Sequence, residues 1–442
     1  MLQKLKEHIE SNLPFLKDKR LLIAISGGVD SVVLTYLLKK LDFQIALAHC
    51  NFQLRGQESD LDEALILSIG KELAIPVFST KFETQDHATK HKKSIQVAAR
   101  ELRYNYFDEI LNEQEYDFIL TAHHADDNLE TFLINLTRGT GLDGLTGIPT
   151  QNGKITRPLL VFSRLEILNY ANSNAITWRE DQSNSENKYI RNKIRNEVVP
   201  ILKEINPSLL ESFQNTNKHL QESQEIVKDC IENVRHEIIT KDGDITKFNI
   251  EKILGLSNPK AYLYHFLKDY GFKEWNNVFN LLHAQTGKYL ETNSHLLLRN
   301  REFLLFSRKL SSATDAEKFY EIPNNQTTEL NIPFKIYIEN TTKTKVVDEN
   351  TILVDKNLLI YPLFIRKKKQ GDFFYPTGML GKKKLSKFFK DEKMSMIEKD
   401  NTWLLCDANN QIVWVIGKRQ DRRFKVNTTT KNNIRISINP KC

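Results

Sequence analysis

The chain has 442 residues, of which 40% are hydrophobic and 27% are charged. At roughly 150 residues per domain, this length predicts about three folded domains and excludes a single small binding module, while the composition excludes wholesale disorder. The 63 basic and 56 acidic residues leave a net charge of +7, which is too small to identify a partner by itself.

No apolar run approaches the ~18 residues that a membrane-spanning helix needs. The longest runs, near Leu21–Ile25 and Ile412–Ile416, have the length of a strand. The N-terminal segment alternates charged and apolar residues at helical spacing and lacks the apolar stretch of a signal peptide. We therefore expect a cytoplasmic protein with no membrane association.

Short apolar runs alternate with segments of helical period between Leu21 and Leu160. We predict strands at Leu21–Ile25, Ile45–Cys50, Val77–Thr80, Phe118–His123 and Ile155–Leu160. We predict helices at Ser31–Leu41, Asp60–Leu73, Ser94–Leu111 and Asp126–Leu136. This alternation predicts an α/β domain over residues 1–205 with a doubly wound parallel sheet, whose ligands bind outside the carboxyl ends of the strands.

The rest of the chain divides into three further segments. Residues 206–310 are mostly of helical period and predict a helical middle domain. Residues 311–350, rich in Thr, Asn, Lys and Glu, predict a linker with one or two edge strands, and residues 351–442 predict a small α+β domain. The segment from Arg366 to Lys390 contains nine basic residues and a single acidic one, Asp372. This excess of positive charge indicates an anionic partner for the C-terminal domain.

The segment Ser26-Gly27-Gly28-Val29-Asp30-Ser31 joins the first predicted strand to an apolar helix. Backbone N–H groups and the positive end of the helix dipole favour a phosphate there, and glycine lets the backbone approach it closely. A Gly-Gly pair alone is more typical of a simple tight turn, but the whole hexapeptide between a strand and a helix favours an anion site. It is not a Walker A loop, because the Gly-Lys-Ser/Thr sequence is absent.

The hexapeptide resembles the SGGxDS loop of the PP-loop, or N-type, ATP pyrophosphatases. The resemblance narrows to the tRNA(Ile)-lysidine synthetase family through segments at Leu54–Asp60, His123–Thr131, Arg138–Leu145, Arg157–Leu160, Pro376–Met379 and Lys382–Ser386. Two positions depart from the family pattern, because Phe52 stands where a second histidine is expected after His49, and Asn128 stands where glutamine is usual.

The resemblance implies a two-step ligation of free L-lysine to C2 of the wobble cytidine of tRNA(Ile) with a CAU anticodon. ATP adenylates the tRNA and releases pyrophosphate, and lysine then expels AMP. The expected ATP-binding residues are Ser26, Gly27, Gly28, Val29, Asp30, Ser31, His49 and Arg103. Arg103 and Arg100, three residues apart on a predicted helix, either face the nucleotide or pair with Glu101 and Asp108 as surface charges. The implied catalytic residues are Asp30, Asp127, Glu130 and His123, and Asp30 and Asp127 are the carboxylates implied to hold Mg²⁺.

The second step needs a neutral amine. With a lysine pKa near 10.4, keeping the amine neutral at pH 7 costs about 4.6 kcal/mol in water, so a general base or a desolvated pocket must offset this cost. Glu130, Asp126 and His123 are all candidates for this role, and each taken singly is equally typical of a solvated residue or a helix cap.

Two basic regions are candidates for tRNA contact. After a capping box at Ser183 and Glu186, Lys188, Arg191 and Arg195 fall on one helical face, which is either a solvated stripe or a surface for tRNA phosphates. In the C-terminal domain, Arg366–Lys369 and Lys382–Lys390, which include Lys382, Lys383 and Lys384, are interleaved with aromatic residues. This region suits a clamp on the acceptor stem or backbone of the tRNA, and the alternative for its aromatic residues is the domain core.

Two alternatives stay open, and so does the oligomeric state. One is another PP-loop tRNA-modifying enzyme, such as a thiolase, and the other is a tRNA-binding protein with an inactive nucleotide site. A thiolase is disfavoured because no C-x-x-C pair, zinc ribbon or iron–sulfur motif is formed by the four cysteines, Cys50, Cys230, Cys406 and Cys442. The intact loop residues Ser26, Asp30 and Ser31 count against an inactive site.

Overall fold

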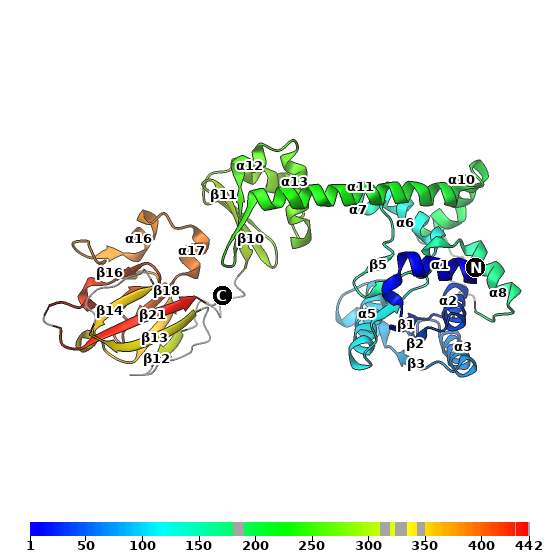
Figure 1. The fold of residues 1–442 in the computed structure, drawn as a ribbon, viewed down its shortest axis with the longest axis horizontal. Coiled ribbons are helices and arrows are strands. Elements are labelled where there is room, and N and C mark those ends of the chain that lie inside the picture. The colour runs from blue at the N-terminus through cyan, green and yellow to red at the C-terminus, as the bar shows by residue number, and fades with distance from the viewer. Residues whose placement is uncertain (180–189, 310–318, 323–333, 343–349, 429, 441–442) are drawn as a thin grey trace. The chain divides into compact units, whose positions relative to one another are not determined.

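The computed structural model describes residues 1–179, 190–309, 319–322, 334–342, 350–428 and 430–440. The chain forms two compact units, Met1–Asp229 and Cys230–Cys442 (Figure 1). Within the described ranges, no helix combines the length and the apolar character that crossing a bilayer requires. The predicted Lys188 and the capping box before it lie outside the described residues.

The first unit is built on a six-stranded sheet of order β3-β2-β1-β4-β6-β5. All neighbours pair in parallel except β5 and β6, which form an antiparallel edge. The strands are β1 (Arg20–Ala24), β2 (Gln44–Asn51), β3 (Val77–Lys81), β4 (Phe118–Leu120), β5 (Gln151–Asn152) and β6 (Ile155–Thr156). The last predicted strand is shorter than expected, because Pro158 cannot donate to a ladder and the chain turns into a 3-10 helix there.

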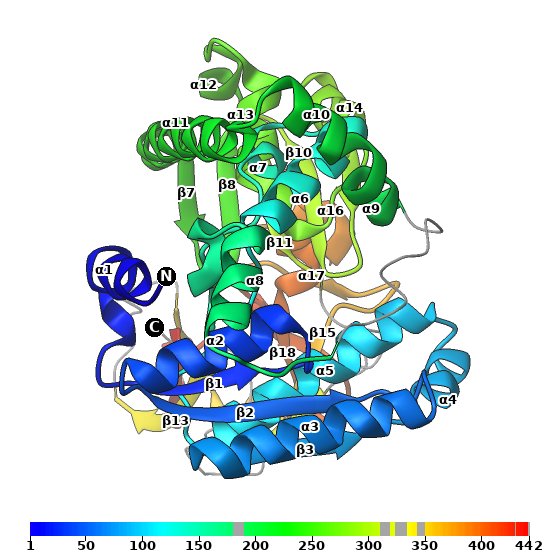
Figure 2. The ribbon, with the colours of Figure 1, turned by 90° about the vertical axis from the view of Figure 1, so that its right-hand side faces the viewer.

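Helices cover both faces of this sheet, as the alternating pattern predicts (Figure 2). The helices of this unit are α1 (Leu2–Asn12), α2 (Val29–Lys40), α3 (Gln57–Leu73), α4 (Thr84–Lys90), α5 (Ile95–Glu113), α6 (Ala125–Thr137), α7 (Leu142–Leu145), α8 (Arg164–Ser173), α9 (Ile190–Lys193) and α10 (Val199–Ile205). On β1, Leu21 and Ile23 pack with α1, α2, α3 and α8, whereas Leu22 points to the other face and packs with α5. All three side chains are fully buried, and each contributes roughly 1.5–3 kcal/mol by leaving water.

The middle of the chain is helical and also contains a sheet. The long helix α11 (Leu209–Ile238) is followed by α12 (Ile250–Leu254), α13 (Pro259–Leu267) and α14 (Trp275–Asn280). An antiparallel sheet of order β7-β8-β11-β10-β9 comprises Ile239–Asp242, Ile245–Asn249, Phe303–Arg308, His295–Asn300 and Tyr289–Glu291. The helical prediction did not include it, because an unbroken apolar triplet such as Leu296–Leu298 has no strand periodicity.

The C-terminal part is an α+β domain in which strands dominate. Its sheets have the orders β12-β15-β18-β19-β20, β13-β21-β14 and β16-β17. The strands are β12 (Phe319–Ile322), β13 (Phe334–Thr341), β14 (Thr351–Asp355), β15 (Leu363–Lys367), β16 (Phe373–Phe374), β17 (Lys383–Lys384), β18 (Trp403–Cys406), β19 (Ile412–Val415), β20 (Arg419–Gln420) and β21 (Asn433–Pro440), and the helices are α16 (Leu385–Asp391) and α17 (Met396–Asn401). The edge strands expected between 311 and 350 are β12 and β13, which pair with β15 and β21.

The loop after α7 is anchored to α6 by Asn128. Its Oδ1 accepts the N–H of Ile148 at 2.6 Å, and the side chain is buried. The neighbouring Gly147 has φ +68°, and a Cβ at this position would lie 2.1 Å from the same Oδ1 atom. Glycine is therefore required both by the backbone conformation and by the close approach of Asn128.

We expect Gly147→Ala to lower the thermal unfolding midpoint by about 10 °C, because it adds the strain of a positive φ and displaces a buried hydrogen-bond acceptor. Gly153→Ala is the matched control, since Gly153 has φ +58° but a Cβ at this position would meet nothing within 4 Å. We expect the control to lose only about 3 °C in the same thermal scan. Equal losses in the two variants would show that the contact with Asn128 contributes nothing.

Candidate active site

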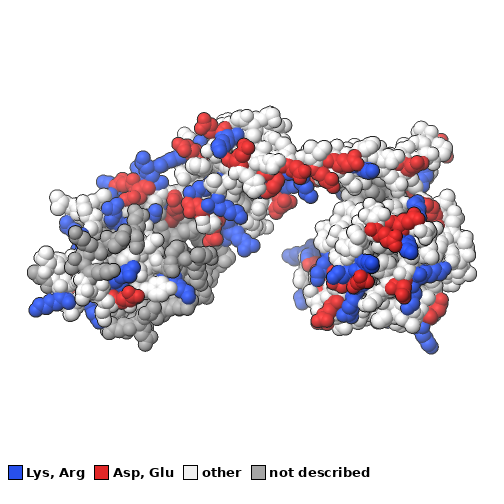
Figure 3. All heavy atoms as spheres, in the orientation of Figure 1, with Lys and Arg blue, Asp and Glu red and all other residues white. Residues whose placement is uncertain are grey.

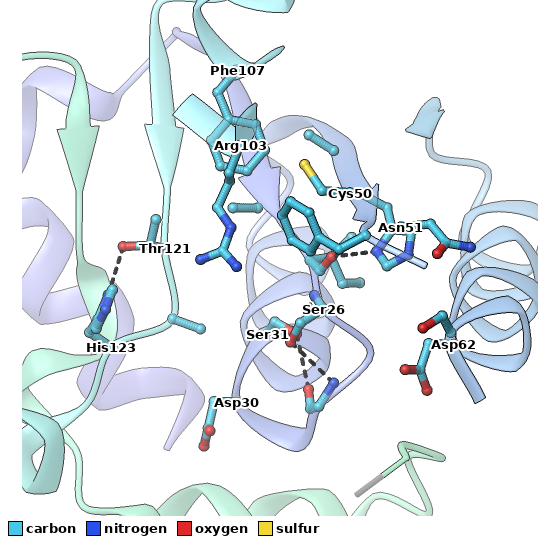
Figure 4. Close-up of a pocket in the computed structure, with 18 of the residues that line it drawn as sticks. Ser26, Asp30, Ser31, Cys50, Asn51, Asp62, Arg103, Phe107, Thr121 and His123 are labelled. Atoms are coloured by element: carbon cyan, nitrogen blue, oxygen red, sulfur yellow. Dashed lines mark hydrogen bonds between the residues drawn. The ribbon is translucent and has the colours of Figure 1, made fainter. Parts of the chain in front are cut away.

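A cavity of about 640 Å³ opens at the carboxyl ends of β1, β2 and β4, where the parallel sheet predicts it (Figure 4). Most of the predicted site residues of the first unit line it. They are Ser26, Gly28, Asp30, Ser31, His49, Arg103, His123, Asp127 and Arg191. The cavity lining does not include Gly27, Val29, Glu130 or Arg195.

The loop between β1 and α2 holds its shape through its own hydroxyl groups. Ser31 Oγ donates to the carbonyl oxygen of Gly28 at 3.0 Å and accepts the N–H of Ser26 at 3.2 Å. Gly27 has φ +88°, a conformation that a residue with a side chain rarely adopts. Helix α2 then begins at Val29 with Gly28 as its N-cap, so the loop is a preformed concave turn at a helix N-terminus.

Asp30 is the carboxylate in the first turn of this helix. Its Oδ1 atom is buried and has no hydrogen-bond partner in the described part of the chain, while Oδ2 lies 3.8 Å from Nε2 of His124. Burial raises the pKa of Asp30, and the nearby charge of His124 only partly opposes this effect. A buried carboxylate oxygen without a partner suits a cation delivered with a triphosphate, since Mg²⁺ commonly uses one or two carboxylates plus substrate phosphates. Over the described ranges, no three His, Cys, Asp or Glu side chains cluster into a protein-only metal site.

Asp127 and Glu130, on the first turns of α6, are held by two arginines. Glu130 receives the Nε of Arg191 at 2.8 Å and the Nε of Arg195 at 2.6 Å, and both arginines donate to Oδ1 of Asp127 at 3.1 Å. Arg191 and Arg195 are thus not a solvated stripe, because both reach inward. Arg191 lines the cavity with a side chain that is 41% exposed, so a ligand can reach it.

The ion pairs set the charge of Asp127. Burial alone would raise its pKa, but the neighbouring His124 and Arg191, together with the backbone N–H of His124, outweigh burial and leave the pKa below its ordinary value. His124 also caps α6, accepting the N–H of Asp127 on Nδ1 at 3.3 Å, while its own N–H donates to Oδ2 of Asp127 at 3.1 Å. Sequence reasoning gave His124 no role, although it belongs to the His123–Thr131 motif. The pair of histidines shortly before two aspartates is the sequence feature that could have indicated it.

Two histidines of the cavity are held neutral. Burial is the main cause that lowers the pKa of His123 to about 4, and its Nδ1 lies 3.0 Å from the hydroxyl of Thr121. Burial likewise lowers the pKa of His49, whose Nδ1 lies 3.0 Å from the carbonyl oxygen of Ile25. Asp126, by contrast, turns away from the cavity and accepts Lys203 Nζ at 2.7 Å and the N–H of Arg164 at 2.9 Å.

Arg103 reaches from α5 into the middle of the cavity, between His123 on one wall and the Ser26 loop on the other (Figure 4). Its guanidinium carbon lies 5.2 Å from the centre of the Phe52 ring. Phe52 in turn stacks on Phe82, with ring centres 5.8 Å apart and an angle of 21° between the planes. The ring at position 52 therefore supports the arginine.

The basic residues of the C-terminal domain are only partly available to a ligand. Arg366 is buried and forms a two-pronged ion pair with Asp372 at 2.8 and 2.9 Å, so it belongs to the core. Lys382 and Lys384 are exposed, and Lys383 pairs with Asp391 at 2.8 Å. Of the interleaved aromatic residues, Phe374, Phe388 and Phe389 are core residues with at most 2% exposure. On the face drawn in Figure 3, acidic and basic side chains are interspersed over both units.

Family models match along most of the chain. Residues 1–202 match the PP-loop domain, residues 241–309 the TilS substrate binding domain and residues 363–438 the TilS substrate C-terminal domain. The tRNA(Ile)-lysidine synthase of Parabacteroides distasonis is 36% identical over 445 residues, covering 99% of this chain and all of the relative. That of Bacteroides thetaiotaomicron is 37% identical over 440 residues, covering 99% of each.

The chain belongs to the tRNA(Ile)-lysidine synthase family. Its matches over the full length confirm the family resemblance and the enzyme class that the sequence motifs predict, an ATP-using ligase of tRNA processing. The cavity lies in the part of the chain that matches the PP-loop domain, so it is the candidate active site.

We expect Phe52→Leu to reduce kcat/KM about 2- to 5-fold, the size of one cation–π contact at an accessible site, whereas Phe52→Tyr keeps the ring and stays near the wild type. If Phe52 acts through Arg103, the double variant Phe52→Leu/Arg103→Ala is no slower than Arg103→Ala alone. Steady-state kinetics of these variants and the wild type check this. Additive losses would show that the ring contacts a substrate directly.

The neutral His123 makes stability depend on pH. An unfolded histidine takes up a proton near pH 6.5 and the folded one only near pH 4, so the folded state loses stability as pH falls through this window. The difference corresponds to about 3 kcal/mol. We expect His123→Gln to lose less stability than the wild type between pH 6.5 and 4 in urea titrations. The control His236→Gln changes an exposed histidine and should follow the wild type, and parallel curves for all three proteins would contradict the assignment.

Proposed function

We propose that the chain ligates free L-lysine to C2 of the wobble cytidine of tRNA(Ile) with a CAU anticodon, through an adenylated tRNA intermediate. One observation carries the proposal: a single cavity is lined both by a preformed anion loop and by Asp127 and Arg191, which belong to a cluster of two carboxylates and two arginines. The family membership supports it, because the named relatives are tRNA(Ile)-lysidine synthases.

The loop residues are assigned to the triphosphate. The backbone around Gly27, Gly28 and Val29 and the hydroxyls of Ser26 and Ser31 face an anion, and the dipole of α2 favours it. His49 lies beside the loop, since its Nδ1 is 3.0 Å from the carbonyl oxygen of Ile25, and the guanidinium of Arg103 reaches the region where charge develops as pyrophosphate leaves. Mg²⁺, held by Asp30, would neutralise phosphate charge when bound. Asp127 would be a second ligand of Mg²⁺ only if Arg191 and Arg195 released its Oδ1 atom.

The carboxylate–arginine cluster is assigned to the substrate lysine. An amino acid carries both an anionic carboxylate and a cationic amine, and this cluster offers partners for both. Arg191 is the arginine that a carboxylate can reach, since it lines the cavity. Glu130, which is 1% exposed, holds both arginines in place.

The cavity also favours the neutral ε-amine of the substrate. Removal from water lowers the pKa of an ammonium group, so the buried wall of the cavity reduces the cost of deprotonation. His123 is neutral in this cavity and presents an imidazole that accepts a hydrogen bond from the amine. With a pKa of about 4 it orients the amine rather than retaining its proton. Asp126 is no longer a candidate base, because Lys203 and Arg164 occupy it.

The tRNA-contacting residues are assigned from charge. Lys382 and Lys384 are exposed on the C-terminal domain, and Lys383 is partly exposed there. Lysine side chains on this surface suit phosphates of the tRNA backbone. Arg191 meets the tRNA only at the cavity, where the target base enters, whereas Arg195 does not line the cavity and holds Glu130 and Asp127 instead. The cytoplasmic location of the enzyme stays a prediction.

The proposal predicts that pyrophosphate release from Mg-ATP requires tRNA(Ile) with the CAU anticodon and that added lysine then appears at the wobble cytidine in nucleoside mass analysis. Asp30→Ala abolishes release but leaves the tRNA dissociation constant within a few fold, because Asp30 serves the nucleotide. Asp108→Ala removes an exposed carboxylate of α5 and is the matched control, with wild-type turnover.

Release without this tRNA, or a modified nucleoside other than lysidine, would point to another PP-loop tRNA-modifying reaction. Folded protein that binds ATP and tRNA yet releases no pyrophosphate would favour a tRNA-binding protein with an inactive nucleotide site. An equal loss of tRNA binding in Asp30→Ala would assign that residue a structural role.

A further inference from the structure

The turn between β16 and β17 presents a leucine that is almost wholly in water. Leu380 is 98% exposed, the highest value among the large hydrophobic residues exposed in the described structure, and its neighbour Met379 is 39% exposed. Gly378 and Gly381 enclose the pair with φ of +84° and +90°. We call Gly378–Gly381 the glycine-flanked tip.

The backbone that leads to the tip is anchored. The N–H and the hydroxyl of Thr377 both donate to the carbonyl oxygen of Gln420, at 3.0 and 2.7 Å. The N–H of Met379 donates to the carbonyl oxygen of Pro376 at 3.2 Å, and Arg422 Nη1 donates to the carbonyl oxygen of Met379 at 3.3 Å. Leu380 is therefore held out in water by a fixed turn, and its exposure is not that of a loose chain end.

Cations surround this apolar tip. Lys382 Nζ lies 3.7 Å from the centre of the Phe373 ring, and Lys383 Nζ lies 3.6 Å from Sδ of Met379. Lys384 is exposed next to them. Asp391 pairs with Lys383, which leaves Lys382 and Lys384 to give the surroundings of the tip a net positive charge.

We propose that the glycine-flanked tip packs against a base of the tRNA, with Leu380 on the face of the base and Lys382 and Lys384 on the flanking phosphates. Nucleic acid is the partner whose flat apolar surfaces lie within a few ångströms of regularly spaced anions, which matches an apolar tip between cations. Covering Leu380 recovers the apolar burial that the free protein forgoes. The inference rests on the proposed tRNA substrate and adds a contact that does not depend on charge.

Salt dependence separates the two kinds of contact. Each phosphate contact contributes about 0.7–0.9 to the slope of log K against log salt, whereas an apolar contact contributes nothing to it. We expect Leu380→Ala to weaken binding of the full-length tRNA about 5- to 10-fold at every salt concentration, with an unchanged slope. Lys384→Ala should flatten the slope by nearly one. Leu358→Ala, which truncates another exposed leucine of the same domain, should bind like the wild type.

The test is to measure the tRNA affinity of each variant by fluorescence anisotropy between about 50 and 300 mM salt. Circular dichroism of each variant confirms that it is folded. Binding of Leu380→Ala within 2-fold of the wild type would overturn the inference, and so would a changed slope, which would show that the tip acts through the lysines. A loss shared by Leu358→Ala would mark a general effect on the domain and would also overturn it. None of these outcomes bears on lysidine formation by the wild type. The proposed function is tested separately, by pyrophosphate release and nucleoside mass analysis.

Discussion

The burial of two carboxylates beside each other is the constraint on which the catalytic unit depends. Asp127 and Glu130 lie one helical turn apart, with 14% of the Asp127 side chain and 2% of the Glu130 side chain exposed, an arrangement that is costly unless cations compensate. Arg191 and Arg195 supply that compensation from a segment more than sixty residues away in the chain. The same segment packs its apolar side against α6 and α11 through Leu129, Ile194, Val199 and Phe213. Ion pairs and apolar packing together therefore place the helix that closes one side of the cavity.

Two kinds of electrostatic surface meet in the cavity. A hydroxyl-rich turn at a helix N-terminus favours an anion, and beside it four paired charges suit the amino acid that we propose as substrate. The cavity also contains one cation, Arg103, and two neutral histidines, His49 and His123. Arg103 is positioned by an aromatic stack, and burial keeps His49 and His123 neutral by lowering the pKa of each. A nucleotide and an amine can thus meet in one site without the histidines adding positive charge.

The C-terminal domain shows how a basic sequence is divided between core and surface. Arg366 forms a buried ion pair with Asp372 and is therefore not available to a ligand. Most of the aromatic residues among the lysines belong to the hydrophobic core. Lys382 rests over the Phe373 ring and Lys383 over the Phe388 ring, so aromatic residues also hold the lysines that remain at the surface. The positive charge available at the surface is therefore smaller than the count of basic residues in the sequence.

The amino-acid sequence by itself determined the features that depend on neighbouring residues. The strand–turn–helix at Ser26–Ser31, the parallel sheet and the helices on both of its faces all follow from local periodicity and glycine positions, because backbone hydrogen bonding and burial act over a few residues. Only the tertiary structure decided that Arg191 and Arg195 turn inward to Glu130, that Asp126 leaves the cavity for Lys203, and that Phe52 supports Arg103. These contacts join residues about 50 to 80 positions apart, and a helical period shows which residues share a face but not what that face meets. The sheet in the middle domain was hidden for a related reason, since strands buried on both faces have the same apolar runs as buried helices.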